Sequence, residues 1–212
     1  QAVQTFKQLT VLQPSNPEHR RYLADALLAA NDAGNALLSY QRALELDPEL
    51  VAAQQGVVKA ALVAKRPQDA LRLVQDMQKK NPKDPLPYRL EGDLEFSQRN
   101  AAGAIAAYRK ALQLSRSSET ASLLHGALLR LGRKEEAVRF SAEWLRERPK
   151  DAVFRYHLGD MALTQEDAVG AEKHYRTVLE LQPNNPLALN NVAWLLVRSG
   201  RPGGVAMAEK AT

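Results

Sequence analysis

The nine residues YQRALELDP at 40–48 return as YRKALQLSR at 108–116 and as YRTVLELQP at 175–183. The first two copies lie 68 residues apart, which is twice 34, so a weaker copy is expected halfway between them. The stretch 70–82 supplies it, with Ala, Val, Met and Pro at the matching positions. A fixed period of this length is typical of arrays in which each unit packs mainly against its neighbours. The chain is therefore expected to fold as a stacked array rather than around one central core.

Composition and turn signals indicate that each unit is a pair of helices. Ala and Leu dominate, whereas β-branched and aromatic residues are sparse, and this composition favours helix. Short polar turns with Gly or Asn divide each period in two, where a left-handed residue ends the first helix. The predicted organisation is one array over 1–212, divided into a second helix at 1–16, repeats at 17–50, 51–84, 85–117, 118–151 and 152–185, and a partial repeat at 186–212.

Helix start signals support this register. The last residue of a repeat should cap the first helix of the next, because a short polar side chain can accept a bond from a free helix-end N–H. Proline at the first helical position, as at 17, 85 and 186, loses no hydrogen bond. Five of the six cap positions are polar, Leu50 being the exception, and the five are Asn16, Asp84, Ser117, Asp151 and Asn185.

The period and its small residues resemble the tetratricopeptide repeat family. The small residues stand where the second helix of a unit crosses the first, and they are Ala36, Ala70, Ala104, Ala137 and Ala171. The resemblance implies an all-α, right-handed superhelical solenoid of helix–turn–helix repeats. It also implies a concave face lined by the first helices.

That concave face supplies the candidate binding residues, which fall at positions 2, 5, 9 and 12 of the repeats. They mix charged, amide and aromatic side chains, as suits an extended peptide or a helix of a protein partner. The alternative is that many of them are solvated helix faces. The candidates are Arg21, Asp25, Lys59, Arg89, Asp93, Phe96, Tyr156, Asp160, Asn190 and Trp194.

Some members of the family bind a C-terminal carboxylate through cationic and amide side chains on the first helices. Here Lys59 stands at the same repeat position as Asp25 and Asp93. The two carboxylates would weaken a clamp for an anion, so we do not predict that function.

Motifs for chemistry are lacking in the sequence. There is no cysteine, no glycine-rich phosphate loop and no nucleophile motif, and no two histidines have the spacing of a helical metal site. His157 is interpreted as a polar residue on the groove wall near Asp160. The net charge of +5 is spread along the chain, which disfavours nucleic acid as a partner. We predict a non-enzymatic protein without a cofactor or a metal.

The last third of the chain, 143–181 and 183–211, resembles the C-terminal repeats of bacterial tetratricopeptide lipoproteins associated with PEP-CTERM protein sorting. Those systems accompany exopolysaccharide production. The resemblance implies a scaffold in polysaccharide export or protein sorting, in the periplasm or cell envelope, held to the membrane only through an anchor outside this sequence. Two alternatives stay open, namely a cytoplasmic peptide-binding adaptor or co-chaperone, and a regulatory module of a larger enzyme such as a glycosyltransferase.

Both ends of the sequence fall inside repeats, so we expect a piece of a longer protein. An array that ends within a repeat exposes an apolar face, and such faces tend to pair, so a homodimer through the ends is predicted. The residues expected on the two end faces are Phe6 and Leu9 at one end and Trp194, Leu195 and Met207 at the other.

The fourth repeat generates a first test. It has Ser141 where other repeats carry Tyr or Val, and Trp144 where they carry Ala, Met or Val. We interpret this as a volume-conserving exchange that moves the bulk by one helical turn. Trp144→Ala should then lower the free energy of unfolding by on the order of 3 kcal/mol or more. Urea unfolding followed by circular dichroism measures it, and a loss below about 1 kcal/mol would contradict the interpretation.

Overall fold

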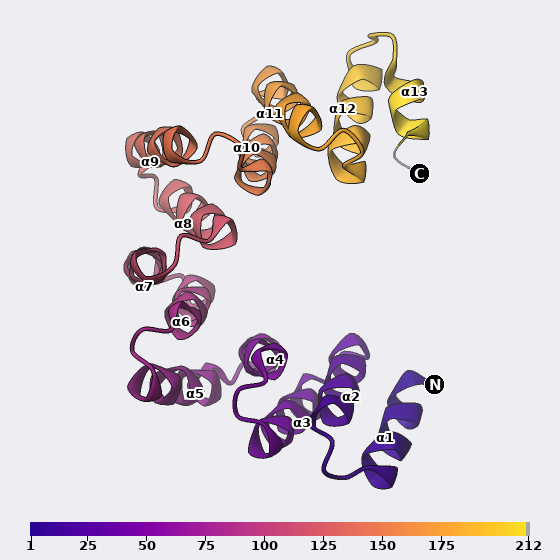
Figure 1. The fold of residues 1–212 in the computed structure, drawn as a ribbon, viewed down its shortest axis with the longest axis vertical. Helices are drawn as coiled ribbons and strands as arrows, with labels where there is room; N and C mark the ends of the chain where they lie inside the picture. Colours follow the sequence, from indigo (N-terminus) through magenta and orange to yellow (C-terminus); the bar gives the residue numbers. More distant parts are fainter. Residues whose placement is uncertain (211–212) are drawn as a thin grey trace. The chain divides into compact units, whose positions relative to one another are not determined.

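The structure is a computed structural model that describes residues 1–210, and within them every regular element is a helix (Figure 1). The all-α fold predicted from the sequence is confirmed. The helices are α1 (Ala2–Leu12), α2 (Pro17–Ala29), α3 (Ala33–Leu46), α4 (Val51–Val63), α5 (Pro67–Lys80), α6 (Pro85–Ser97), α7 (Ala101–Leu114), α8 (Ser118–Arg130), α9 (Lys134–Glu147), α10 (Ala152–Thr164), α11 (Ala168–Leu181), α12 (Pro186–Arg198) and α13 (Gly204–Glu209).

The helices pair in chain order, α2 with α3 and so on to α12 with α13. Every turn within a pair has a residue in the left-handed region just after the first helix. The N–H of the following residue then donates to a carbonyl five residues back, as Asp32 does to Leu27, which satisfies a free carbonyl at the helix end. The left-handed residues at this place are Asn31, Lys65, Arg99, Gly132, Glu166 and Gly200. The sequence analysis predicted Gly or Asn at this place, and that prediction is wrong for the turns with Lys65, Arg99 and Glu166.

The predicted helix caps are confirmed. Asn16 accepts a hydrogen bond from the backbone N–H of Glu18, and Asp151 accepts one from Phe154. The side chains at 84, 117 and 185 make the corresponding bonds. Leu50 supplies no such bond to α4. First helices therefore begin at 17, 51, 85, 118, 152 and 186, where the predicted repeats begin.

The chain divides into two compact units, residues 1–115 and 116–212. In the first unit the first helices α2, α4 and α6 pack side by side, and one buried core runs from Ala24 to Leu94. In the second unit α8 packs against α10, and its buried residues include two smaller clusters, one that contains Tyr175 and one that contains Val178. The prediction that 1–212 forms a single array stays a prediction.

The crossing of the two helices in a repeat depends on small residues. The five alanines predicted at this crossing have no exposed surface. In the third and fifth repeats a second small residue, eighth in the repeat, contacts the ring of a tyrosine that is twenty-fourth. A methyl group added at Gly92 would lie 2.3 Å from Tyr108 Cε1, and one at Gly159 would lie 2.6 Å from Tyr175 Cε1. At Gly92 and Gly159 the ring leaves no room for a Cβ, whereas in the first repeat the eighth residue is Ala24 and the ring of Tyr40 lies against Gly56 of α4.

The fourth repeat fills the same space differently. His125 stands at the eighth position and is buried, whereas Ser141 stands at the tyrosine position and is partly exposed. Trp144 is buried as predicted, and its indole N–H donates to Asp151 Oδ2 over 2.8 Å. Its ring centroid lies 5.8 Å from that of Phe154. The large side chain of the second helix, Trp144, thus stands one turn further along, as inferred from the sequence. A further ring, that of His125, fills space from the first helix, which the sequence analysis did not predict.

The expected end faces are only partly exposed. Leu195 is 3% exposed, so its placement on an exposed face was wrong, because it packs in a cluster to which Met207 of α13 contributes. At the other end Phe6 and Leu9 are half-buried, since Phe6 stacks on Tyr22 with centroids 5.6 Å apart. The exposed apolar side chains of α1 are instead Val11 and Leu12.

The contact between a glycine of the first helix and a tyrosine ring of the second can be tested with a pair of glycine substitutions. Gly159→Ala should lower the free energy of unfolding by about 1 to 3 kcal/mol, because the new methyl group overlaps the ring of Tyr175. Gly34→Ala is the matched control, since a Cβ there meets no atom within 4 Å and alanine favours helix. Its stability should stay unchanged or rise by up to about 1 kcal/mol. Equal effects of the two changes in urea unfolding would contradict the role assigned to the glycine.

Candidate functional site

The first-helix face of residues 1–115 carries paired charges. Arg21 contacts Glu18 and Asp25 at 2.5 and 2.6 Å, and Arg89 contacts Asp93 at 3.0 Å, each pair lying within one helix. The same carboxylates accept hydrogen bonds from buried tyrosines: Asp25 from Tyr40, and Asp93 from Tyr108 over 2.9 Å. These predicted binding residues are therefore also part of the internal packing of their repeats.

Between these two pairs lies α4, which contacts both α2 and α6. Its candidate residue, Lys59, is exposed and makes no ion pair within residues 1–210. Gln55, one turn earlier, is exposed as well, and Phe96 on α6 is half-buried. Lys59 is thus the candidate on this face whose charged group is available to a partner.

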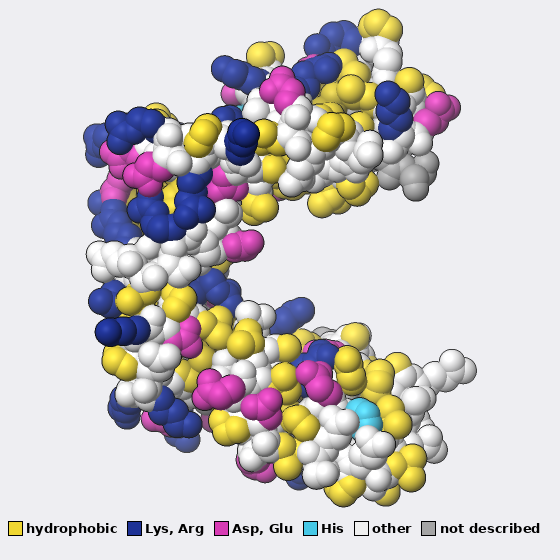
Figure 2. All heavy atoms as spheres, in the orientation of Figure 1, with side chains coloured by type: hydrophobic (Ala, Val, Ile, Leu, Met, Phe, Trp, Pro, Cys, Tyr) yellow, Lys and Arg dark blue, Asp and Glu magenta, His cyan; other side chains and the backbone are white. Residues whose placement is uncertain are grey.

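The first-helix face of residues 116–212 has a different chemistry. On α12 three large apolar side chains are exposed along one stripe: Leu187 at 61%, Trp194 at 48% and Val197 at 62%. Asn190 lies exposed within the stripe, and Arg198 stacks on Trp194 with its Cζ 5.0 Å from the ring centroid. Figure 2 shows hydrophobic side chains on the surface over α11 to α13, whereas Lys and Arg gather over α9. This apolar stripe is defined by Leu187, Trp194 and Val197.

Tyr156 and Asp160 on α10 are tied to the neighbouring helices. Asn191 Nδ2 donates to Tyr156 Oη over 2.9 Å, and the Tyr156 ring lies 5.3 Å from that of Tyr175. Tyr175 Oη in turn donates to Asp160 Oδ1 over 2.6 Å. The network holds Tyr156 in place between α11 and α12, and burial raises the pKa of its phenol.

The tyrosine–aspartate bond is a feature that sequence reasoning missed. It joins the ninth and twenty-fourth positions of a repeat, and it occurs in the first, third and fifth repeats. The sequence contains a signal for this bond. The two repeats that have Lys59 or Gly126 instead of aspartate at the ninth position also lack the tyrosine at the twenty-fourth. Burial raises the pKa of the Asp93 carboxyl even though Arg89 and Tyr108 both favour its ionised form. Burial, followed by the bonded carboxylate, raises the pKa of Tyr175.

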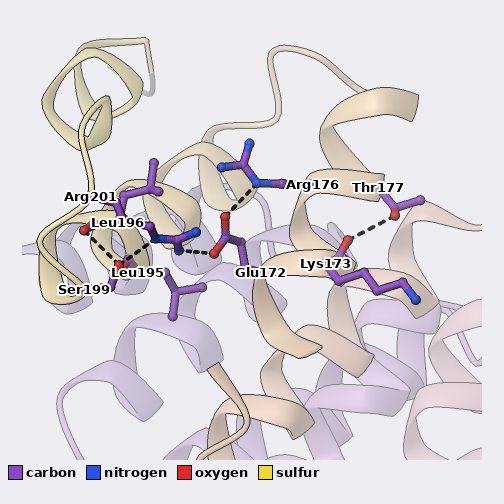
Figure 3. Close-up of polar contacts among 8 residues, drawn as sticks. All are labelled: Glu172, Lys173, Arg176, Thr177, Leu195, Leu196, Ser199 and Arg201. Atoms are coloured by element: carbon purple, nitrogen blue, oxygen red, sulfur yellow. Dashed lines mark hydrogen bonds and ion pairs between the residues drawn. The ribbon is translucent and has the colours of Figure 1, made fainter. Parts of the chain in front are cut away.

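A second buried carboxylate holds the turn before α13 (Figure 3). Glu172 on α11 is 9% exposed and accepts from Arg176 Nε over 2.8 Å and from Arg201 Nη2. Arg201 also donates to Ser199 Oγ over 2.9 Å. The Arg201 hydrogen bond is the main cause that lowers the pKa of Glu172. These contacts fix the α12–α13 turn and with it the C-terminal end of the helix that carries the apolar stripe.

Neither a metal-binding cluster nor a membrane-spanning helix is found within residues 1–210. No group of three or more His, Asp or Glu side chains there is placed to hold a metal ion. No helix in the same range combines the length and the apolar character that crossing a bilayer requires.

The chain has paired helices with capped ends, small residues at the helix crossings and two first-helix faces. These features define a helical repeat protein of the class that mediates protein–protein interactions. A tetratricopeptide repeat model matches residues 1–50 and 126–186, just over half of the chain, and another matches residues 27–94. The chain belongs to the tetratricopeptide repeat family, as the sequence predicted. Such repeats support a role as a protein–protein interaction scaffold.

Known proteins similar to the chain agree with this fold. The chain is 37% identical over 101 residues to the "Probable biofilm formation methyltransferase WspC" of Pseudomonas putida. The matched stretch covers 46% of this chain and 24% of that protein. Yeast Tom70 matches 98% of this chain and 45% of its own with a TM-score of 0.66, and TTC0263, a protein of Thermus thermophilus, matches 85% and 99% with a TM-score of 0.61. Both structures are 17% identical, so they bear on the fold alone. The chain spans about a quarter of the curated relative and under half of Tom70.

Removal of one hydroxyl tests the structural role of the aspartates. Tyr175→Phe should lower the free energy of unfolding by about 1 to 2 kcal/mol, because Asp160 loses a buried donor. Tyr22→Phe is the control, since Tyr22 is 40% exposed and its hydroxyl has no hydrogen bond within the described residues; it should change stability by less than about 0.5 kcal/mol. If the two variants unfold at the same urea concentration, Asp160 is free of this structural role.

Proposed function

We propose that the chain is a non-catalytic docking module that binds a protein partner on its first-helix faces. The apolar stripe of α12 would receive apolar side chains of the partner, and Lys59, on the first-helix face of residues 1–115, would contact polar or charged ones. Asn190 would bond the partner's backbone amides.

The exposure of the apolar stripe is the observation that carries the proposal. Leu187, Trp194 and Val197 are three and seven residues apart, spacings that place them on one side of a helix. Apolar groups exposed together are costly in water, and such patches mark interaction sites. A tryptophan with an arginine stacked on it is also the kind of residue that contributes most to binding.

A cell-envelope setting is the narrower part of the proposal. Its support is the resemblance of 143–181 and 183–211 to bacterial tetratricopeptide lipoproteins of PEP-CTERM sorting and exopolysaccharide systems. In that setting the partner is a component of polysaccharide assembly or protein sorting in the periplasm or cell envelope. Membrane attachment would come from an anchor outside this sequence, and pairing through Val11 and Leu12 would give a homodimer.

A second candidate is an interaction module of a larger enzyme. The observation in its favour is the match to part of a protein named as a probable biofilm formation methyltransferase, of which this chain spans 24%. In that case the repeats would dock a regulator or substrate protein for a catalytic domain elsewhere in the same polypeptide. The cytoplasmic adaptor or co-chaperone is the remaining alternative.

A comparison of two surface variants tests the proposal. The chain, the triple variant Leu187→Ala, Trp194→Ala and Val197→Ala, and a control would each be used to capture partners from a bacterial envelope extract, with mass spectrometry as the readout. The control is Val138→Ala with Val169→Ala, since these side chains are 64% and 82% exposed on the second helices α9 and α11. All three proteins should first show equal helix content by circular dichroism.

The expected result is a partner held by the chain and the control and lost from the triple variant. Truncation of one central tryptophan alone should weaken binding roughly 30-fold, which calorimetry with the purified partner would measure. A partner retained by the triple variant would overturn the assignment to α12. A captured partner that is a regulator or substrate protein of an enzyme, rather than a component of envelope assembly, would favour the second candidate.

A further inference from the structure

Two histidines from neighbouring repeats meet inside the second unit. His125 of α8 and His157 of α10 place Nδ1 and Nε2 2.9 Å apart, with ring centroids 5.0 Å apart and the rings nearly perpendicular. At this distance one nitrogen donates a proton and the other accepts it, so the contact requires at least one neutral ring. The sequence interpretation of His157 as a groove-wall residue beside Asp160 missed this partner, which lies 32 residues away in the chain.

The pair is part of a cluster that joins three helices. Phe154 of α10 lies 5.9 Å from His125 and 5.8 Å from His157, measured between ring centroids. Phe154 also contacts Phe140 and Trp144 of α9, at 6.1 and 5.8 Å. We call these five rings the aromatic joint: His125, Phe140, Trp144, Phe154 and His157. His125 is 5% exposed, so a charge on its ring would enter apolar surroundings.

Several charged groups on these helices have partners other than the histidine pair. Ionisable side chains on the three helices include Glu119 and Arg130 of α8, Glu136 and Glu143 of α9, and Arg155 and Asp160 of α10, with Asp151 as the N-cap of α10. Asp151 accepts from Trp144 and Ser118, and Asp160 accepts from Tyr175. Glu136 pairs with Arg133, Glu119 accepts from Ser117, and Arg155 donates to a backbone carbonyl. Within residues 1–210, the hydrogen bond and the ring contacts of the two histidines involve no carboxylate.

The protonation equilibria follow from this burial. Burial lowers the pKa of His125 to about 4, and burial together with the neighbouring His125 lowers the pKa of His157 to about 4. No carboxylate counters either effect. In the unfolded chain both rings have an ordinary pKa near 6.5. Below about pH 6.5 the unfolded chain thus binds protons that the folded chain excludes, so stability falls as the pH falls towards 4.

We propose that the His125–His157 contact makes the aromatic joint acid-sensitive, closed while the pair is neutral and opened when both rings are protonated. Two protonated rings would direct N–H groups at each other across 2.9 Å, which no hydrogen bond allows. Opening would separate α8 from α10 and alter the face that presents Tyr156 and Asp160. The proposal concerns the joint itself and does not depend on the identity of any partner.

The test uses a pair that keeps the contact and cannot titrate. In the double variant His125→Asn and His157→Gln, the Asn amide replaces Nδ1 and the Gln amide replaces Nε2, so a hydrogen bond can form at every pH. His174→Gln is the matched control, because His174 lies in the same unit on α11 and outside the pair; burial lowers its pKa as well, so this variant should lose only the part of the pH dependence that belongs to His174. All proteins carry Trp194→Phe, which leaves Trp144 of the joint as the single fluorescent indole. Urea unfolding is followed by Trp144 fluorescence and by circular dichroism at a series of pH values from about 7.5 to 4.5.

For the parent and for His174→Gln, the unfolding equilibrium constant reported by Trp144 should rise between pH 7.5 and pH 5 by roughly tenfold or more for each histidine of the pair. In the double variant that additional rise should disappear, whatever its absolute stability. If the double variant does not fold, each single variant should lose about half of the pH dependence. An equal pH dependence in the parent and in the variants of the pair would overturn the proposal, as would loss of the dependence in His174→Gln alone.

Discussion

The structure depends on the contact between a ring on the second helix of a repeat and a small residue on the first. Tyr108 over Gly92 and Tyr175 over Gly159 leave no space for a single methyl group, so they fix how closely the two helices approach. The phenol oxygen at the edge of each ring then bonds an aspartate one residue beyond the glycine. One ring thus sets both the spacing of the helices and the position of a charged residue on the first-helix face.

This contact explains why some candidate binding residues take part in the packing of their repeat while others do not. Asp25, Asp93 and Asp160 were selected as groove residues by position, yet each accepts a bond from a buried tyrosine. A partner that took these acceptors would compete with the packing of the repeat. Lys59 and the exposed stripe on α12 do not take part in this packing, so they are the parts of the two faces that a partner can bind.

The fourth repeat shows what happens when the contact is replaced. With His125 in the glycine position and Ser141 in the tyrosine position, the space is filled by imidazole, indole and phenyl rings from three helices. Buried imidazoles pack like other rings while neutral but resist protonation there, because charge is costly in apolar surroundings. The exchange keeps the volume filled and adds a titratable group to the joint.

The sequence by itself determined the period, the helix pairs, the caps and the family. These follow from local rules: Asn16 or Asp151 caps the helix that begins beside it, and a 34-residue spacing places Ala36 and Ala70 at equivalent crossings. The positions on the first-helix faces could be named for the same reason. Tertiary structure decided which of them bond inward, the pairing of His125 with His157, the burial of Leu195 and the link from Glu172 to Arg201. Those contacts join residues 15 to 32 positions apart, and whether they form depends on the packing of neighbouring repeats, which a local pattern does not encode.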